Sequence, residues 1–248
     1  MTLRHLALAI AETARISIPT LVDSFSGKLT PEICDQRLLD WSGKLLEQAQ
    51  IHLRVDGLEH AAPGEAFVIM SNHQSHYDIP VLFQALRRRV RMVAKRELFK
   101  IPGWGRAMRL AGFVEVDRGD PAQAIKSLEN AARALSEGTS IWIAPEGTRG
   151  PGDALLPFKQ GGFHMAQSIG ARILPVSIDG TSRVLEAHGR RVSQGVDVRV
   201  TVHEPIATSD FTPEQRAELV ALVRRTIARD VSSLRPEAVK PTNGSPAR

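Results

Sequence analysis

The stretch AFVIMSNHQSHYDIPVLFQAL, residues 66–86, decides the fold. It begins with a short, uninterrupted apolar run over 66–70, which is typical of a buried strand. A polar loop follows, and the chain becomes apolar again from Ile79. We predict a strand over 66–70 and a helix near 78–89, joined by a loop that carries two histidines and an aspartate.

The same alternation continues along the chain. Further strands are predicted near residues 51–56, 91–95, 113–117, 140–144, 172–178 and 196–203. Helices are predicted near residues 97–111, 121–137, 161–169 and 213–231. Because strands that alternate with helices favour a parallel sheet, we expect a single α/β domain over 51–231, with a largely parallel central sheet flanked by helices.

Two amphipathic helices are expected to precede this domain, within residues 1–50. Pro19 is expected to kink or end the first, and the second starts at Thr30 and Pro31, a capping residue followed by proline. For the first helix we favour membrane binding, whereas the second can bind a membrane or pack on the sheet. The apolar stripe of the first helix consists of Leu3, Leu6, Ile10, Ala14, Ile18 and Leu21. The proline-rich tail, 232–248, is expected to be disordered.

Composition excludes several classes of protein. Hydrophobic residues at 42% and charged residues at 24% are ordinary for a globular chain of 248 residues. The single cysteine, Cys34, excludes an internal disulfide and fits a reducing cytoplasm. No apolar run reaches the roughly 18 to 20 residues of a membrane-spanning helix, and charged residues interrupt any signal-peptide pattern. We therefore expect a peripheral or monotopic protein on the cytoplasmic face of a membrane.

The charge pattern indicates an acidic partner. The net charge is +5, and the segment 87–118 alone holds ten basic residues against three acids. Aromatic residues make up only 5% of the chain, so few side chains can stack on bases, and no nucleic-acid recognition motif is present. Anionic lipid or phosphate is therefore favoured, and nucleic acid is not expected as a partner.

The loop SNHQSHYDIP, residues 71–80, allows three interpretations. His73, His76 and Asp78 are ligands that zinc accepts, but no further residues with ligand spacing accompany them, so no metal is expected. Alternatively, Asp78 can bend back to His73, fix its tautomer and leave the other ring nitrogen free to take a proton. The third interpretation is a helix-capping aspartate and a structural histidine, which the spacing alone favours.

No enzyme nucleophile accompanies this pair. The chain lacks a Gly-x-Ser-x-Gly elbow, and Cys34 lies on the apolar face of a predicted helix. If His73 is a base, the group that it deprotonates therefore belongs to the substrate, and a hydroxyl is the natural candidate.

Two further segments follow predicted strands. APEGTRG, residues 144–150, offers backbone amides, a hydroxyl and a guanidinium that suit a phosphate, although a simple turn with a solvated Arg149 is the alternative. GFVEVDR, residues 112–118, is a strand that ends in Arg118. Ligands in α/β sheets bind beyond the carboxyl ends of the strands, so these segments and the His73 loop are expected to converge.

Together these segments resemble the 1-acylglycerol-3-phosphate O-acyltransferase (lysophosphatidic acid acyltransferase) family of glycerolipid acyltransferases. The resemblance covers roughly residues 50–180, and its four motifs correspond in order to Asn72, His73 and Asp78; Gly112 and Arg118; Pro145, Glu146, Gly147, Thr148 and Arg149; and Leu174, Pro175 and Val176. The segment LLPFKQGGF, residues 155–163, is also similar to the family.

The resemblance implies a reaction in phospholipid biosynthesis. A fatty acyl group would pass from an acyl thioester, acyl-CoA or acyl-ACP, to the free hydroxyl of a lysophospholipid such as 1-acylglycerol 3-phosphate. The thioester would be a co-substrate, and no other cofactor is implied. His73 would be the base, Asp78 its orienter and Asn72 a brace for the loop. The acceptor phosphate would be held by Gly147, Thr148 and Arg149, with added charge from Arg118 and Lys95, while Glu146 would position Arg149 or an acceptor hydroxyl and Gly112 and Pro145 would support the motifs.

This chain departs from the family pattern at Glu115, Ala144 and Gly150. These positions leave the histidine and aspartate intact but leave the acceptor open, so the sequence also allows another lysolipid in that role. It allows two further functions as well: a metal-dependent lipid or phosphate hydrolase, and a non-catalytic protein that binds anionic lipid.

Overall fold

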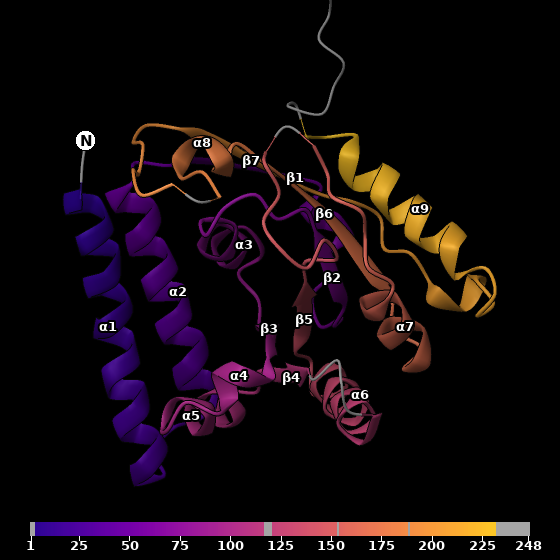
Figure 1. Ribbon diagram of the computed structural model, residues 1–248, viewed down its shortest axis with the longest axis horizontal. Coiled ribbons are helices and arrows are strands. Elements are labelled where there is room, and N and C mark those ends of the chain that lie inside the picture. Colours follow the sequence, from indigo (N-terminus) through magenta and orange to yellow (C-terminus); the bar gives the residue numbers. More distant parts are fainter. Residues whose placement is uncertain (1–2, 117–120, 153, 188, 232–248) are drawn as a thin grey trace, which may run out of the picture.

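The computed structural model describes residues 3–116, 121–152, 154–187 and 189–231. Its strands form one sheet with the order β1-β7-β6-β2-β5-β3-β4 (Figure 1). All neighbouring strands are parallel except β6 and β7. The strands are β1 His52–Asp56, β2 Val68–Ser71, β3 Val90–Lys95, β4 Val114–Val116, β5 Ser140–Ile143, β6 Ile173–Asp179 and β7 Asp197–Val202. The predicted α/β fold with a largely parallel sheet is confirmed.

Strand β2 lies at the centre of the sheet, between β6 and β5. It is buried on both faces, which explains why its sequence is continuously apolar rather than alternating. Phe67 and Ile69 belong to the core on one face, and Val68 and Met70 to the core on the other. Because β2, β5 and β6 run in the same direction, the loops that follow them lie at one edge of the sheet.

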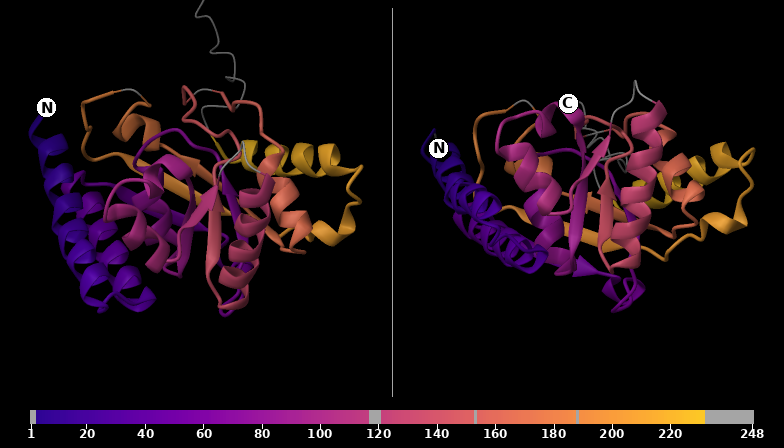
Figure 2. Two further views of the ribbon diagram at one scale, coloured as in Figure 1. Left: turned by 60° about the horizontal axis from the view of Figure 1, so that its bottom comes forward. Right: turned by 90° about the horizontal axis from the view of Figure 1, so that it is seen from below.

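Helices cover both faces of the sheet (Figures 1 and 2). Helix α3 packs on one face with α2 outside it and α1 outermost, while α6, α7 and α9 lie on the other. The helices are α1 Leu3–Ser26, α2 Pro31–Gln48, α3 Asp78–Leu86, α4 Arg96–Phe99, α5 Trp104–Leu110, α6 Pro121–Ser136, α7 Gly161–Ser168, α8 Thr181–Val184 and α9 Arg216–Ala228, with short 3-10 turns at η1 Leu58–His60 and η2 Thr208–Asp210.

Several helices differ from the sequence prediction. Helix α3 ends at Leu86 rather than near residue 89. Helix α1 does not end at Pro19 but runs on to Ser26. The helix predicted over 97–111 is two helices, because Gly103 adopts a positive φ of 75° between α4 and α5. The last helix begins at Arg216 rather than near residue 213.

The second N-terminal helix packs on the domain. The Thr30 hydroxyl caps α2 as predicted, accepting a hydrogen bond from the Ile33 N–H at 3.3 Å. Leu45 and Leu46 belong to the core beside α3, and Cys34 is also buried. The buried face of α2 thus packs against α3 and the core. Within the described ranges, no helix has the length and apolar character needed to cross a membrane. The tail, 232–248, lies outside the described residues.

Candidate active site

The loop after β2 is tied to the neighbouring strand β6. The Asn72 side-chain amide donates to the Ile178 carbonyl at 2.7 Å, and its oxygen accepts from the Ile178 N–H at 2.8 Å. Asn72 is completely buried, so both bonds are shielded from water. The loop therefore starts from a fixed point at the edge of the sheet.

Asp78 collects the polar groups of this loop. It is the first residue of α3 and fully buried, and its Oδ2 accepts from the backbone N–H groups of Gln74 at 2.7 Å and Ser75 at 2.9 Å. The same oxygen lies 2.7 Å from His73 Nδ1, and Oδ1 accepts from the Thr181 hydroxyl. The contact between His73 and Asp78 that the second interpretation requires is therefore present. Asp78 thus organises the helix start and orients the ring as well.

The geometry fixes which nitrogen of His73 is available. A carboxylate at Nδ1 favours the tautomer that carries the proton there, which leaves Nε2 as the acceptor. No described residue forms a hydrogen bond to Nε2, and 17% of the His73 side chain is exposed. The Trp142 ring contacts the imidazole edge-on, with the ring centroids 5.5 Å apart. His73 therefore presents an oriented, accessible proton acceptor at the edge of the sheet.

Glu146 joins the loop after β5 to the His73 loop. Its Oε1 accepts from the His73 N–H and its Oε2 from the Leu156 N–H, both at 2.8 Å. Burial raises the pKa of Glu146, while these two bonds act in the opposite direction. Only 2% of Glu146 is exposed and both oxygens bind main chain, so it does not contact Arg149, one of its two expected partners. Glu146 holds two loops together instead. Its contact with an acceptor hydroxyl stays a prediction.

The rest of the PEGTRG turn, residues 145–150, carries the positive charge of Arg149. Gly147 has φ = 71°, and a Cβ built on it would lie 2.8 Å from Lys159 Nζ, so the Lys159 side chain lies against this turn. Among the described residues, the Arg149 guanidinium has no hydrogen-bond or ion-pair partner, and Thr148 is exposed. The pKa of His76 is lowered first by burial and then by Arg149, which places positive charge near the loop. Pro145 is buried, and its carbonyl accepts from the Lys159 N–H at 2.8 Å.

Of the remaining predicted site residues, the structure describes Lys95 and Gly112. Lys95 ends β3, where it pairs with Val116 of β4, and Gly112 forms the turn before β4 with φ = 84°. Arg118 lies outside the described residues. Within the described part of the chain, no group of three or more His, Cys, Asp or Glu side chains is placed to hold a metal ion, so the metal interpretation finds no ligand set there.

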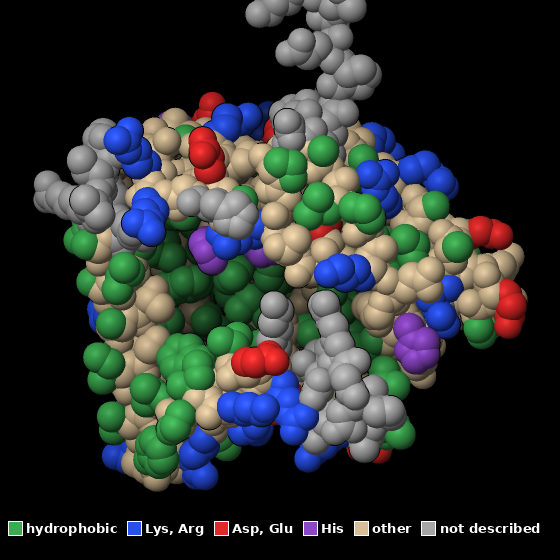
Figure 3. All heavy atoms as spheres, in the orientation of Figure 1, with side chains coloured by type: hydrophobic (Ala, Val, Ile, Leu, Met, Phe, Trp, Pro, Cys, Tyr) green, Lys and Arg blue, Asp and Glu red, His purple; other side chains and the backbone are tan. Residues whose placement is uncertain are grey.

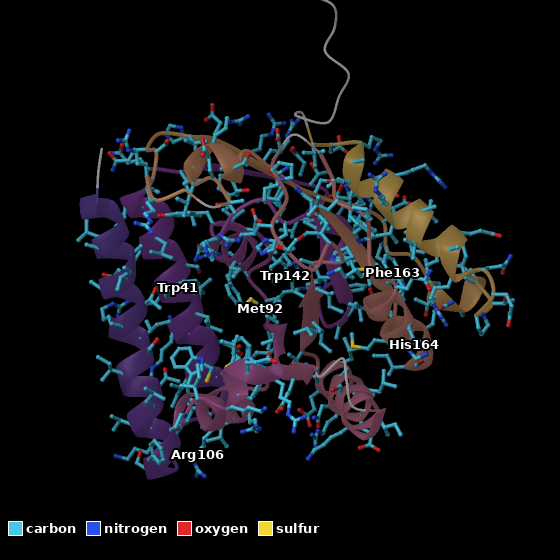
Figure 4. All side chains as sticks on the ribbon, viewed as in Figure 1. Trp41, Met92, Arg106, Trp142, Phe163 and His164 are labelled. Carbon is cyan, nitrogen blue, oxygen red and sulfur yellow. The ribbon has the colours of Figure 1, made fainter. Side chains whose placement is uncertain are left out.

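An apolar cavity of about 340 Å³ opens beside the site. Figure 3 shows it as a hollow walled by hydrophobic side chains, with histidine side chains at its rim. Ile79, which follows Asp78, lines it, and so does Met92, which pairs across the sheet with Trp142 (Figure 4). Other lining residues include Leu38, Trp41, Phe83, Met108 and Phe113.

Sequence reasoning missed Thr181, Trp142 and Lys159. Thr181 and Trp142 are far from the His73 loop in sequence, and no local pattern marks them as its neighbours. Lys159 lies in LLPFKQGGF, a segment that resembled the family, and this was the available signal.

The fold and the site define a class: an α/β protein with a histidine–aspartate pair and a cationic turn at one edge of its sheet. The family model for Acyltransferase matches residues 52–179, just over half of the chain. The chain belongs to this family, which includes the 1-acyl-sn-glycerol-3-phosphate acyltransferases.

Individual relatives carry that name. The chain is 33% identical over 187 residues to 1-acyl-sn-glycerol-3-phosphate acyltransferase alpha of Mus musculus, covering 74% of this chain and 66% of the mouse protein. It is 32% identical over 174 residues to the 1-acyl-sn-glycerol-3-phosphate acyltransferase of Haemophilus influenzae, covering 70% of this chain and 71% of that protein. The chain thus spans about two thirds of the mouse relative's length.

A solved structure has the same fold. The crystal structure of the 1-acyl-sn-glycerophosphate acyltransferase of Thermotoga maritima superposes with a TM-score of 0.71 and 26% identity, covering 90% of this chain and 93% of that one. The similarity therefore includes segments that lie outside the residues matched by the family model.

Proposed function

We propose that this protein transfers a fatty acyl group from an acyl thioester to the free hydroxyl of 1-acylglycerol 3-phosphate, which gives phosphatidic acid. One observation carries the proposal: the oriented His73, with Nε2 unpartnered among the described residues, lies between a cationic turn and an apolar cavity. The three features match the hydroxyl, the phosphate and the fatty chain of such a reaction.

His73 Nε2 takes the proton from the acceptor hydroxyl as the oxygen attacks the thioester carbonyl. The C–S bond of the resulting tetrahedral intermediate then breaks, and the departing thiolate takes the proton back from the imidazolium. The buried carboxylate of Asp78 stabilises that imidazolium and holds the ring in place. General-base help of this kind contributes about 10²- to 10⁴-fold in rate.

The acceptor phosphate binds at the PEGTRG turn. In 1-acylglycerol 3-phosphate, four bonds separate the attacking oxygen from phosphorus, so the phosphate lies within about 5 Å of that oxygen. The Arg149 guanidinium, whose charge acts on His76 in the His73 loop, suits this position. Gly147 and Thr148 supply an amide and a hydroxyl.

The apolar cavity takes a fatty chain. Each methylene that leaves water stabilises the complex by about 0.8 kcal/mol, so an apolar cavity beside the reacting carbonyl favours a long chain. The cavity runs from Ile79 and Met92 towards α5 and α1.

Helix α1 docks on the surface of an anionic membrane, which makes this a peripheral or monotopic protein. Large hydrophobic side chains are exposed along α1 and on the adjoining α4–α5 segment, and the basic residues around α5 can meet lipid headgroups. The exposed residues are Leu8, Ile10, Ile18, Val22 and Phe25 on α1, and Leu98, Ile101 and Leu110 on α4–α5.

Vesicle sedimentation tests this docking. The triple variant Ile18→Asn, Val22→Asn, Phe25→Asn should bind phosphatidylglycerol vesicles at least about tenfold more weakly, because it removes apolar area that enters the interface. Leu58→Asn combined with Ile125→Asn, at two other exposed hydrophobic positions, is the matched control. Equal binding by both variants would show that α1 is not the docking surface.

Release of free thiol tests the activity. With 1-acylglycerol 3-phosphate and an acyl thioester, the wild type should release thiol, and His73→Ala should reduce the rate by at least about 10²-fold. The control is His164→Ala, an exposed histidine on α7 that Figure 4 places away from the cavity. Full activity of a folded His73→Ala variant would refute the assignment of the base.

A further inference from the structure

A second, polar cavity of about 570 Å³ lies beside the ends of β3 and β4, between α4–α5 and α6. Five cationic side chains and one carboxylate line it, together with Ser127, Asn130 and Phe113. The charged residues are Arg96, Lys100, Arg109, Lys126 and Arg133, with Glu115 as the acid. Figure 3 shows basic side chains gathered along this side of the apolar hollow.

Some of these cations are held in place and others are available. Glu115 bonds Arg109 at 3.0 Å and approaches Arg96 at 4.0 Å, and Arg109 also stacks over the Phe99 ring. Lys100 and Lys126 are exposed and have no hydrogen-bond or ion-pair partner among the described residues. The cavity thus combines an ordered framework with two free ammonium groups, which suits a ligand that carries several negative charges.

The polar cavity lies too far from His73 to hold the phosphate of the acceptor. Neighbouring strands lie about 4.8 Å apart, so β4, three strands from β2, ends about 14 Å from the start of the His73 loop. The acceptor phosphate must lie within about 5 Å of the reacting oxygen. The anion that binds here therefore belongs to the other substrate.

The same distance fits coenzyme A. Thirteen bonds separate its sulfur from the nearer phosphorus, which corresponds to about four extended residues, or about 14 Å. With the thioester at His73, a pantetheine arm of this length brings the diphosphate to the basic cavity. Phe113 lines both cavities, so the two adjoin at that residue.

We infer that this basic cavity binds the adenosine 3′-phosphate 5′-diphosphate end of an acyl-coenzyme A donor. The inference rests on the proposed function and adds the identity of the donor. A recessed volume of this size is typical of small-molecule sites, whereas a folded acidic carrier protein needs an extended outer surface.

Two donors test the inference by kinetics. An acyl-coenzyme A and the matching acyl-pantetheine, which lacks the phosphates and adenosine, are compared with the double variant Lys100→Gln, Lys126→Gln. We expect kcat/KM for the coenzyme A donor to fall about 10- to 100-fold and the preference over acyl-pantetheine to collapse. The matched control is Lys44→Gln, Arg225→Gln, which removes two exposed cations from α2 and α9 and should keep the preference.

Titration with adenosine 3′,5′-bisphosphate tests the site without turnover. The wild type and control should bind it, and the double variant should bind it at least about tenfold more weakly. If the wild type binds the bisphosphate but turns over no thioester, the proposed function fails and the nucleotide site stands. Three kinetic results would overturn the inference. The double variant could lose activity equally with both donors, it could keep wild-type kinetics, or the wild type could use acyl carrier protein and reject acyl-coenzyme A. Loss of vesicle binding without loss of bisphosphate binding would assign the cavity to lipid headgroups and overturn it too.

Discussion

At the residue scale, Asp78 is where local structure and proposed chemistry meet. Its carboxylate accepts from two loop N–H groups, the Thr181 hydroxyl and the His73 ring. In Asp78→Asn, the side-chain amide can still accept some of these hydrogen bonds, but it has no negative charge to stabilise an imidazolium. We expect kcat to fall about 10²- to 10⁴-fold with little change in KM for either substrate, measured by steady-state thiol release.

A folding defect would lower activity for another reason, so the Asp78→Asn variant needs a control. Its thermal unfolding should be compared with that of Asp210→Asn, a change at an exposed aspartate away from the site. A folded Asp78→Asn variant with wild-type kcat would show that the carboxylate only organises the loop.

Single residues show what the sequence could and could not predict. The strand, loop and helix predicted around His73 and Asp78 allowed their contact, although the spacing alone favoured a helix cap and a structural histidine. The direction of Glu146 did not, because a carboxylate in a turn can face a ligand or bind main chain, and only its burial decides. The partners of Asn72 and Asp78 across the site, Ile178 and Thr181, are more than 100 residues away along the chain, so no local pattern reveals them.

At the element scale, the close approach of α4 and α5 depends on Gly105. A Cβ at this position would lie only 1.8 Å from the Phe99 carbonyl oxygen, so a larger residue must push the two helices apart. We expect Gly105→Ala to lower the free energy of unfolding by about 1–3 kcal/mol, measured by urea denaturation. Gly161→Ala is the matched control, because nothing lies within 4 Å of the added carbon. Equal free energies of unfolding for the two variants would show that α4 and α5 can move apart without loss of stability.

The sequence predicted best those elements that a short local pattern of residues marks. The strands followed from short apolar runs, since a buried parallel strand needs little else. Helix α1 was expected to kink or end at Pro19, and it does not end there, because tertiary contacts support its continuation. Arg37 of α2 donates to the Thr20 hydroxyl at 3.0 Å and to Asp23 at 2.5 Å, just beyond the proline. Such contacts between helices offset the cost of the missing backbone bond, and the sequence of α1 does not contain them.

At the scale of the whole molecule, the order of the strands places the histidine pair, the basic cavity and the apolar cavity at different positions along one edge of the sheet. The ends of β2 and β5 carry the histidine pair and the cationic turn, and the ends of β3 and β4 border the basic cavity. The apolar cavity lies between these groups and the N-terminal helices. This division follows from strand order, so it could not be read from the sequence until the order was known.

The stability of the whole domain should depend on the buried His203. It follows β7, bonds Ser177 of β6 at 2.7 Å, and lies against α9, where Ser177 also donates to the Ile227 carbonyl. Burial lowers the pKa of His203 to about 4, with Arg229 and His60 acting in the same direction and Asp230 opposing them. In the unfolded chain the pKa returns to about 6.5.

Because the pKa of His203 is lower in the folded state, the unfolded state binds a proton that the folded state does not between about pH 6.5 and pH 4. Stability is therefore lost as the pH falls through this window, by up to about 3 kcal/mol from this residue. Urea denaturation at pH 7, 6 and 5 should show a smaller loss for His203→Gln than for the wild type, whatever the stability of the variant at pH 7. His164→Gln, at an exposed histidine, should keep the wild-type dependence. If His203→Gln loses stability with the wild-type slope, then the folded protein accepts the proton at His203, and α9 does not seal that histidine from water.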